Sequence, residues 1–333
     1  MSKKRNRSKQ KQSRQKQPKR PYTAIIAVIL IVVVGASILF WRRTAAPPLP
    51  ADYATGTVLS CLRRPAFISE LGLEQPSIDT SQTIAIGLII REPFAGGRYY
   101  QHETWDDAGS VGPFAYDQSG TIYIGPAPLA SVETNPTAEQ NWIYAVDSET
   151  AVMTQYLELP WPKPPGGNNP FGITGLTYDC DSDSLYAASV AGSTGQEEVG
   201  GIYQIDLESN KIVSSFTAKD AVGIGIYNGV NGKRLYYGLA RSPEIYSIGL
   251  NAETGHFWGE PRLEFSLAAQ SGGSFDNAHR IQFTNDGTMI VKGVEFSYSL
   301  QVASDPQRNI YTFQYEPASD SWIFVDVVQE QSN

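Results

Sequence analysis

Residues 201–216 read GIYQIDLESNKIVSSF, in which an Ile-Tyr pair lies in a short apolar strand that is followed by a polar turn. Three similar stretches begin at Trp142 (WIYAVDSETAVMTQYLEL), Glu244 (EIYSIGLNAETG) and Asn309 (NIYTFQYEPASDSWIFVDVV). An apolar strand, a polar turn and a returning apolar strand are typical of a β-hairpin. The chain therefore repeats one kind of hairpin four times.

A second hairpin precedes each Ile-Tyr strand. Its turn contains Asp, Asn or Gly, which tolerate the left-handed backbone conformations that close hairpins. The four copies are GPFAYDQSGTIYIG (112–125), ITGLTYDCDSDSLYAAS (173–189), GIGIYNGVNGKRLYYG (223–238) and RIQFTNDGTMIVKG (280–293). Four antiparallel strands that recur every 50–60 residues are typical of β-propeller blades, so the predicted fold is all-β.

The clear blades cover about residues 108–328. Residues 52–107 contain two further apolar stretches, QTIAIGLII (82–90) and RYYQHETW (98–105), which are enough for one degenerate blade. We therefore predict a propeller of five blades. A sixth blade would require the strands around residues 58–68 to form more than a partial blade or a closing strand.

Two segments, GITGLTYDCDSDSLYAAS (172–189) and HRIQFTNDGTMIV (279–291), resemble blades of the senescence-marker-protein/gluconolactonase-like and NHL-type β-propeller superfamily. The resemblance is at the level of single blades and covers about residues 108–328. It implies a propeller fold. For lactonase-like members it also implies a divalent cation held near the axis by carboxylate and amide oxygens.

The loops that lead into the innermost strands place Asp or Asn seven to nine residues before the aromatic residue that ends each strand. In a radial fold, equivalent positions face one another across the axis, and oxygen ligands suit Ca²⁺ or another divalent hard cation. The predicted metal ligands are Asp107, Asn169, Asp220 and Asp276. The alternative is that these exposed loop residues only shape turns and cap strands.

Three neighbours of this ring, Asn168, Asn277 and His279, are predicted ligand-binding residues. His279 and Arg280 are also candidates for an acid/base and an anion clamp, which makes them the weak catalytic candidates of the sequence. The sequence contains no G-x-S-x-G elbow and no CxxC pair. If the protein is an enzyme, its catalytic residues are therefore unknown from the sequence.

Charge divides the chain sharply. Residues 1–20 carry ten Lys/Arg and no acidic residue, whereas residues 44–333 carry 14 Lys/Arg against 34 Asp/Glu, a net charge of −20. Phosphate contacts need clustered cations, so we expect no nucleic acid binding by the large domain.

Residues 24–41 contain no charge and would form roughly 27 Å of helix, close to the thickness of a bilayer core. We predict a basic, disordered cytoplasmic tail (1–21), a single-pass transmembrane anchor (22–43), a Pro/Ala-rich linker (44–56) and an extracytoplasmic propeller (57–333). The ten cations before the span, against Arg42 and Arg43 after it, place the N-terminus in the cytoplasm. Oxidising conditions outside the cytoplasm would permit a disulfide between the two cysteines, Cys61 and Cys180.

Two functional readings follow. The preferred one is a membrane-tethered extracytoplasmic module that binds a small ligand, a glycan or a protein through one propeller face. The alternative is a metal-dependent hydrolase of the lactonase or esterase type with its site on the axis. A structural subunit of a membrane complex is a third reading.

Overall fold

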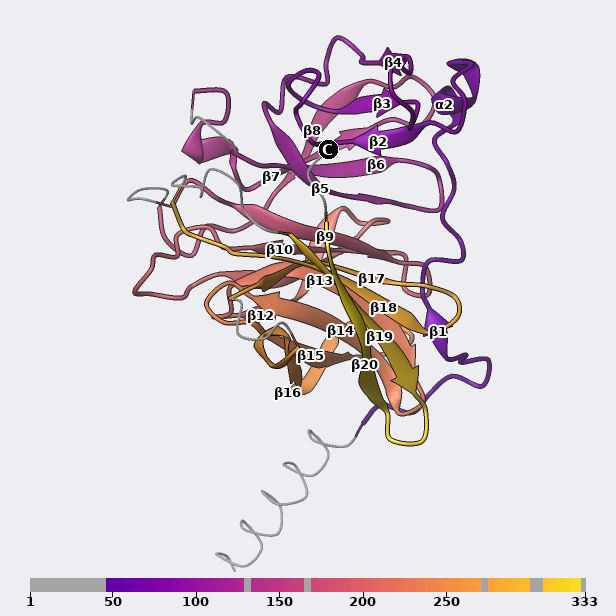
Figure 1. Cartoon of the computed structure of the whole chain (residues 1–333), viewed down its shortest axis with the longest axis vertical. Coiled ribbons are helices and arrows are strands. Elements are labelled where there is room, and N and C mark those ends of the chain that lie inside the picture. Colours follow the sequence, from indigo (N-terminus) through magenta and orange to yellow (C-terminus); the bar gives the residue numbers. More distant parts are fainter. Residues whose placement is uncertain (1–45, 129–132, 165–168, 271–274, 300–307, 331–333) are drawn as a thin grey trace, which may run out of the picture. The chain divides into compact units, whose positions relative to one another are not determined.

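The computed structural model describes residues 46–128, 133–164, 169–270, 275–299 and 308–330. These residues form five antiparallel sheets that follow one another in chain order, from the indigo strands of the first sheet to the yellow strands of the fifth (Figure 1). The first strands of the second to fifth sheets contact one another in turn and are the innermost strands. The predicted all-β propeller of five blades is confirmed.

The strands of each sheet are bounded as follows. The first sheet contains β2 (Ser77–Asp79), β3 (Ile89–Arg91) and β4 (Tyr99–Tyr100), and the second contains β5 (Val111–Tyr116), β6 (Ile122–Pro126), β7 (Trp142–Val146) and β8 (Met153–Glu158). The third contains β9 (Ile173–Asp179), β10 (Ser184–Ser189), β11 (Gly201–Asp206) and β12 (Lys211–Thr217). The fourth contains β13 (Ala221–Gly229), β14 (Gly232–Leu239), β15 (Glu244–Leu250) and β16 (Phe257–Ser266), and the fifth contains β17 (Asn277–Phe283), β18 (Thr288–Val294), β19 (Asn309–Glu316) and β20 (Ser321–Gln329).

The remaining elements are short. They are β1 (Gly56–Thr57), which pairs with β13, the helix α2 (Ala66–Glu70), and the 3₁₀ turns Thr137–Glu139 and Leu267–Ala269. No helix in the described part of the chain is long and apolar enough to cross a membrane. The predicted tail (1–21) and membrane span (22–43) lie outside the described residues.

The Ile-Tyr pairs lie in the third strand of the second to fifth blades, and in the second, third and fourth blades each pair packs against two neighbouring blades. In β7, Ile143 packs between the second and third sheets, whereas Tyr144 packs between the first and second. In β11, Ile202 faces the fourth sheet and Tyr203 faces the second. Because successive side chains of a strand point to opposite faces, one dipeptide contributes to two interfaces between blades.

The first blade is shorter than the sequence suggests. Strands were expected over 82–90 and 98–105, but only Ile89–Arg91 and Tyr99–Tyr100 pair in those stretches. Gly87 has φ +95°, and a Cβ atom at this position would lie 2.1 Å from the carbonyl oxygen of Trp105. This close approach lets the fully buried Trp105 pack under the blade, and the chain leaves the extended conformation there.

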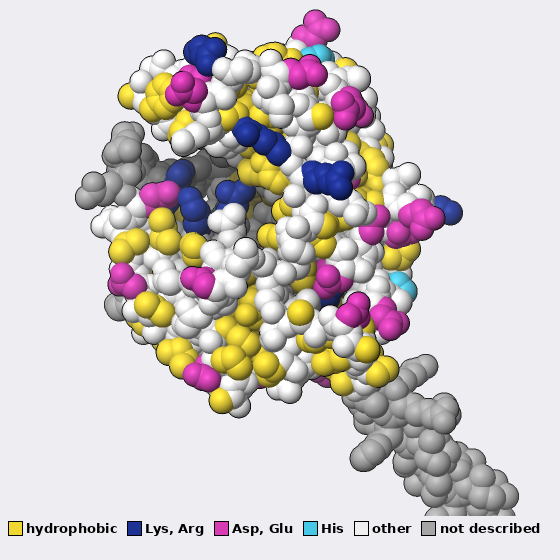
Figure 2. All heavy atoms as spheres, turned by 90° about the vertical axis from the view of Figure 1, so that its right-hand side faces the viewer, with side chains coloured by type: hydrophobic (Ala, Val, Ile, Leu, Met, Phe, Trp, Pro, Cys, Tyr) yellow, Lys and Arg dark blue, Asp and Glu magenta, His cyan; other side chains and the backbone are white. Residues whose placement is uncertain are grey.

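The described buried core does not join the last blade of the propeller to the first. Among the described residues, the buried clusters join each sheet to the next, but none joins the fifth sheet to the first. On β20, Ile323, Val325 and Val328 point away from the core and are each about half exposed. One face of the molecule is hollowed, and Lys and Arg side chains gather in and beside the hollow (Figure 2).

Residues 53–68, which we call the strap, cross the inner hairpins of three blades in succession. Near its start β1 pairs with the end of β13 in the fourth blade. Farther along, the carbonyl oxygen of Val58 accepts a hydrogen bond from Cys180 N in the third blade, and Arg63 N donates to Asp117 O in the second. The strap thus forms neither a sixth blade nor a partial one.

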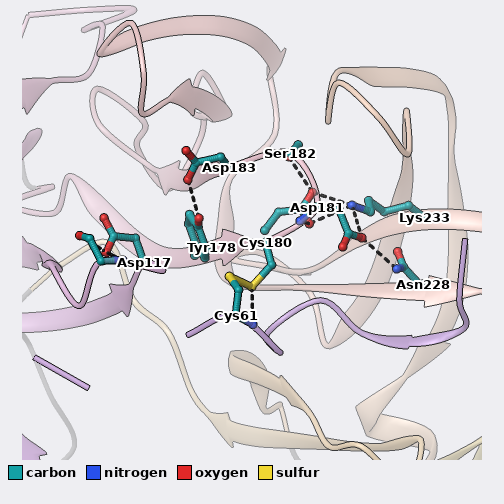
Figure 3. The surroundings of a disulfide bond; sticks show 11 residues. Cys61, Asp117, Tyr178, Cys180, Asp181, Ser182, Asp183, Asn228 and Lys233 are labelled. Carbon is teal, nitrogen blue, oxygen red and sulfur yellow. Dashed lines mark hydrogen bonds and ion pairs between the residues drawn. A yellow bond between two sulfur atoms is a disulfide. The ribbon is translucent and has the colours of Figure 1, made fainter. Parts of the chain in front are cut away.

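Cys61 and Cys180 form a disulfide, with their Cα atoms 5.8 Å apart (Figure 3). Cys180 lies in the turn between β9 and β10, so the bond ties the strap to the third blade. Next to it lies a buried ion pair between blades: the ammonium of Lys233 on β14 contacts the carboxylates of Asp179 and Asp181 at 2.8 Å. Burial raises the pKa of Asp179, and Lys233 opposes this shift.

We expect Cys61→Ser to lower the free energy of unfolding by about 2–5 kcal/mol, because the disulfide restricts the unfolded chain over a long loop. The loop spans 119 positions. Urea unfolding of the full-length protein, with and without a thiol reductant, measures the effect. Reduced wild type should have the same urea midpoint as the variant. A wild-type midpoint that does not change on reduction would contradict a structural role of the disulfide.

Candidate ligand-binding site

Asn169, a predicted metal ligand, holds a loop instead of facing the axis. Its Nδ2 donates to the carbonyl oxygens of Val190 and Ser193, at 2.9 and 3.0 Å. Its Oδ1 accepts a hydrogen bond of 2.9 Å from Phe171 N. The side chain is buried, and its three hydrogen bonds go to the backbone. The expectation of an exposed loop residue is wrong here.

Asp220, the second predicted ligand, is fully buried. Its carboxylate accepts hydrogen bonds from the Ser193 hydroxyl at 2.6 Å, Gly200 N at 2.9 Å and the Tyr298 hydroxyl at 2.5 Å. Burial raises the pKa of Asp220, while these three hydrogen bonds act in the opposite direction. Asn169 and Asp220 are therefore brought together, but they meet at Ser193 rather than around an open site.

Asp276 and Asn277 behave in the same way. The carboxylate of Asp276 accepts hydrogen bonds of 2.6 Å from Asn309 Nδ2 and from the Tyr311 hydroxyl. Asn277 Nδ2 donates to two backbone carbonyl oxygens at 2.8 and 3.1 Å, and its Oδ1 accepts from a backbone N–H. Both side chains are about 5% exposed, which again contradicts the expected exposure.

Asp107 differs from the other three predicted ligands in its exposure. It is exposed and lines a pocket of about 250 Å³ beside β7 and β8 of the second blade, with Glu139 and Tyr144. Within the described part of the chain, no three His, Cys, Asp or Glu side chains lie close enough together to hold a metal ion. These contacts agree with the alternative reading, in which the polar residues hold loops. Asn168 lies outside the described residues.

Asn169→Ala should lower the free energy of unfolding by about 1–3 kcal/mol, because it leaves buried backbone groups without a partner. Asp107→Ala, at the exposed member of the predicted ring, is the matched control and should change stability by less than about 0.5 kcal/mol. Urea unfolding with and without Ca²⁺ measures both. Ca²⁺ stabilisation of wild type that either variant abolishes would instead support the cation ring.

The innermost strand of the fifth blade presents the polar pair His279 and Arg280. The guanidinium carbon of Arg280 lies 5.0 Å from the centroid of the Phe114 ring, which belongs to β5 of the second blade. Such a cation–π contact is stabilising when the cation is partly buried. Phe114 in turn contacts the ring of Tyr116, with 5.7 Å between centroids. Arg280 thus spans from the fifth blade to the second.

Arg64 of the strap donates a hydrogen bond of 3.1 Å from its guanidinium to Pro76 O. Burial raises the pKa of Tyr116, and the positive charges of Arg64 and Arg280 act against this shift. The residues Phe114, Tyr116 and Arg64 were not among the site residues predicted from the sequence. The only signals were an aromatic pair on an inner strand and two adjacent arginines after Cys61.

His279 reaches solvent, but the protein around it and the charges of Arg280 and Arg308 lower its pKa to about 4. Near neutral pH it is an uncharged group that can donate or accept a hydrogen bond. Its folded-state pKa lies below the ordinary value of 6.5. Its contribution to stability is therefore present above about pH 6.5 and is lost as the pH falls towards 4.

The four innermost strands offer His279 few partners for acid/base chemistry. Between them, β5, β9, β13 and β17 contain a single carboxylate, Asp179. That carboxylate is fully buried and is paired with Lys233. The inner strands therefore supply hydrogen-bonding groups, one arginine and aromatic rings.

No family model and no curated protein matches the chain. Several solved β-propeller enzymes share its fold. A luciferin-regenerating enzyme is 12% identical, with 84% of this chain and 80% of that chain covered and a TM-score of 0.46. An exo-β-1,3-galactanase from Phanerochaete chrysosporium is 12% identical, with 83% and 66% covered and a TM-score of 0.43.

An endo-arabinase from Bacteroides thetaiotaomicron is 13% identical, with 62% of this chain and 76% of that chain covered and a TM-score of 0.37. Similarities of this size concern the fold and carry no argument about activity. The comparisons do not confirm the expected membership of the senescence-marker-protein and NHL-type superfamily.

Proposed function

We propose that the chain is a membrane-tethered, extracytoplasmic binding module whose ligand is a small molecule or a glycan bound beside His279 and Arg280. The observation that carries this proposal is the reach of Arg280 across to Phe114, with the solvent-accessible His279 next to it. Hydrogen-bonding groups and aromatic rings of this kind orient a ligand in a concave site. Figure 2 shows a hollow on one face of the molecule, with Lys and Arg side chains in and beside it.

The hydrolase alternative depends on a metal ion or on paired carboxylates. The described residues bring no three potential ligands together, and the one carboxylate of the inner strands is paired with a lysine. A binding module needs neither feature. We therefore prefer binding over hydrolysis, and we keep His279 and Arg280 as ligand-binding residues.

The tether is proposed from the sequence. Residues 24–41 are uncharged and follow ten cations, which favours a single span with the N-terminus in the cytoplasm. The disulfide between Cys61 and Cys180 supports an oxidising compartment for the propeller, because disulfides persist mainly outside the cytoplasm.

Protease added to intact cells should degrade the propeller and spare an epitope placed within residues 1–20, because only the propeller faces the medium. Immunoblotting against both regions makes the measurement, and detergent-permeabilised cells are the control in which both regions should be lost. Protection of the propeller in intact cells would contradict the proposed orientation.

Ligand binding should depend on His279. The full-length protein, reconstituted in nanodiscs, is applied to an array of saccharides and small metabolites. The control is His256→Ala, which changes another exposed histidine. Wild type and this control should bind the same compounds. His279→Ala should bind them with at least tenfold lower affinity. Equal binding by both variants, or no binding by wild type, would contradict the proposed site.

A further inference from the structure

The pocket on the second blade, which we call the second-blade pocket, is separate from the site proposed above. It has a volume of about 250 Å³ and lies beside β7 and β8, the third and fourth strands of that sheet. Its lining residues are Asp107, Glu139, Tyr144, Met153, Thr154 and Gln155. None of them belongs to β17, which carries His279 and Arg280, or to β5, which Arg280 contacts.

Two carboxylates line this pocket without a cation of the protein beside them. Asp107 lies in the turn before β5, and Glu139 lies in the 3₁₀ turn before β7. Neither forms an ion pair with a described residue, and the lining contains no Lys, Arg or His. Carboxylates that face one concave space make its potential negative and raise the local concentration of cations.

Tyr144 adds a buried polar group to the same space. Its side chain is only 3% exposed, yet it lines the pocket. No described residue accepts a hydrogen bond of normal length from its hydroxyl. Burial raises the pKa of Tyr144; the amide of Gln155, directly opposite on β8, lowers it, and the charges of Glu139 and Asp107 raise it further. A buried hydroxyl without a partner is costly, so a ligand that bonds to it would be favoured.

Buried Asn135 joins the two loops that carry the carboxylates. Its Oδ1 accepts a hydrogen bond of 3.0 Å from Ser110 N, and its Nδ2 donates to the carbonyl oxygens of Ala108 and Ser110 at 3.2 and 2.9 Å. Ala108 directly follows Asp107, and Asn135 precedes Glu139 by four positions. The backbone that carries both carboxylates is therefore fixed before a ligand binds, which lowers the entropic cost of binding.

A primary ammonium group matches these features. It has three N–H donors, and hydrogen bonds between an ammonium and a carboxylate are strengthened by both charges. The Tyr144 oxygen can accept a further hydrogen bond, and its ring can attract the cation. The buried side chain of Met153 supplies an apolar wall for a short alkyl chain. Ca²⁺ takes six to eight oxygen ligands, and the described residues bring no three acidic or histidine side chains together here.

We propose that the second-blade pocket binds a primary alkylammonium group between Asp107, Glu139 and Tyr144. This inference goes beyond the proposed function, because it assigns a second site, with a cationic ligand, to a different part of the propeller. The ammonium group can come from a free amine or from a lysine side chain. The experiment distinguishes these two sources.

The test is isothermal titration of the full-length protein in nanodiscs of neutral lipid at pH 7. The amine probes are n-butylamine and the lysine derivative Nα-acetyl-lysine amide. At least one of them should bind at least tenfold more tightly than n-butanol, which has no charge, and than tetramethylammonium, which has no N–H donor. Binding of butylamine alone identifies a free amine as the ligand, and binding of the lysine derivative identifies a side chain.

Glu139→Gln should weaken amine binding at least tenfold, because it removes a charge-assisted hydrogen bond. Tyr144→Phe, which removes only the hydroxyl, should weaken it severalfold. The matched control is Glu149→Gln, because Glu149 is an exposed carboxylate of the same blade that does not line the pocket. It should bind the amine like wild type. If Tyr144→Phe unfolds, Glu139→Gln still decides the result.

Three outcomes would overturn the inference. The first is that neither amine binds more tightly than butanol. The second is equal binding of the amine by Glu139→Gln, Tyr144→Phe and Glu149→Gln. The third is Ca²⁺ binding that depends on Glu139 while neither amine binds, which would make the pocket a metal site. None of these outcomes bears on ligand binding at His279, so the two proposals fail separately.

Discussion

The arrangement of the blades depends on the strap. Four interfaces between consecutive blades are packed with buried side chains, but the described core leaves the fifth blade unjoined to the first. The strap joins the fourth, third and second blades through a strand pair, a disulfide and backbone hydrogen bonds. It also leads into α2, whose Phe67 and Ile68 are buried between the first and second blades. One extended segment therefore joins the fourth, third, second and first blades.

The polar residues near the innermost strands divide into two groups with different physical roles. Asn169, Asp220 and Asp276 are buried and satisfied by groups of the protein, so they stabilise loops. His279 reaches solvent, and Arg280 contacts Phe114 where the fifth and second blades approach each other. A buried polar group without a partner is costly, which explains why the first group is fully used.

The blades could be predicted from the sequence because hairpin turns and the alternation of side chains along a strand are local patterns. The repeated Ile-Tyr pairs mark the same strand in successive blades. The short strands of the first blade could not be predicted, because where they begin and end depends on the contact between Gly87 and Trp105. The polar loop residues were found at the right positions, but a sequence does not distinguish an oxygen that binds a cation from one that binds a backbone N–H. The contact of Arg280 with Phe114 joins two blades that are distant in the sequence, so no local pattern could predict it.

The path of the strap also determines how the propeller would respond to mechanical force. A pull on the chain before Tyr53 acts first on the hydrogen bond from its hydroxyl to Gly229 O and on the two-residue strand β1, contacts that break one after another when peeled. Peeling residues 53–60 would release about 27 Å of chain, at ~3.4 Å per extended residue. The load then reaches Cys61, where a covalent bond transfers it to the third blade. Arg64 lies beyond that point, so tension on the N-terminal side would leave it in place as long as the disulfide is intact.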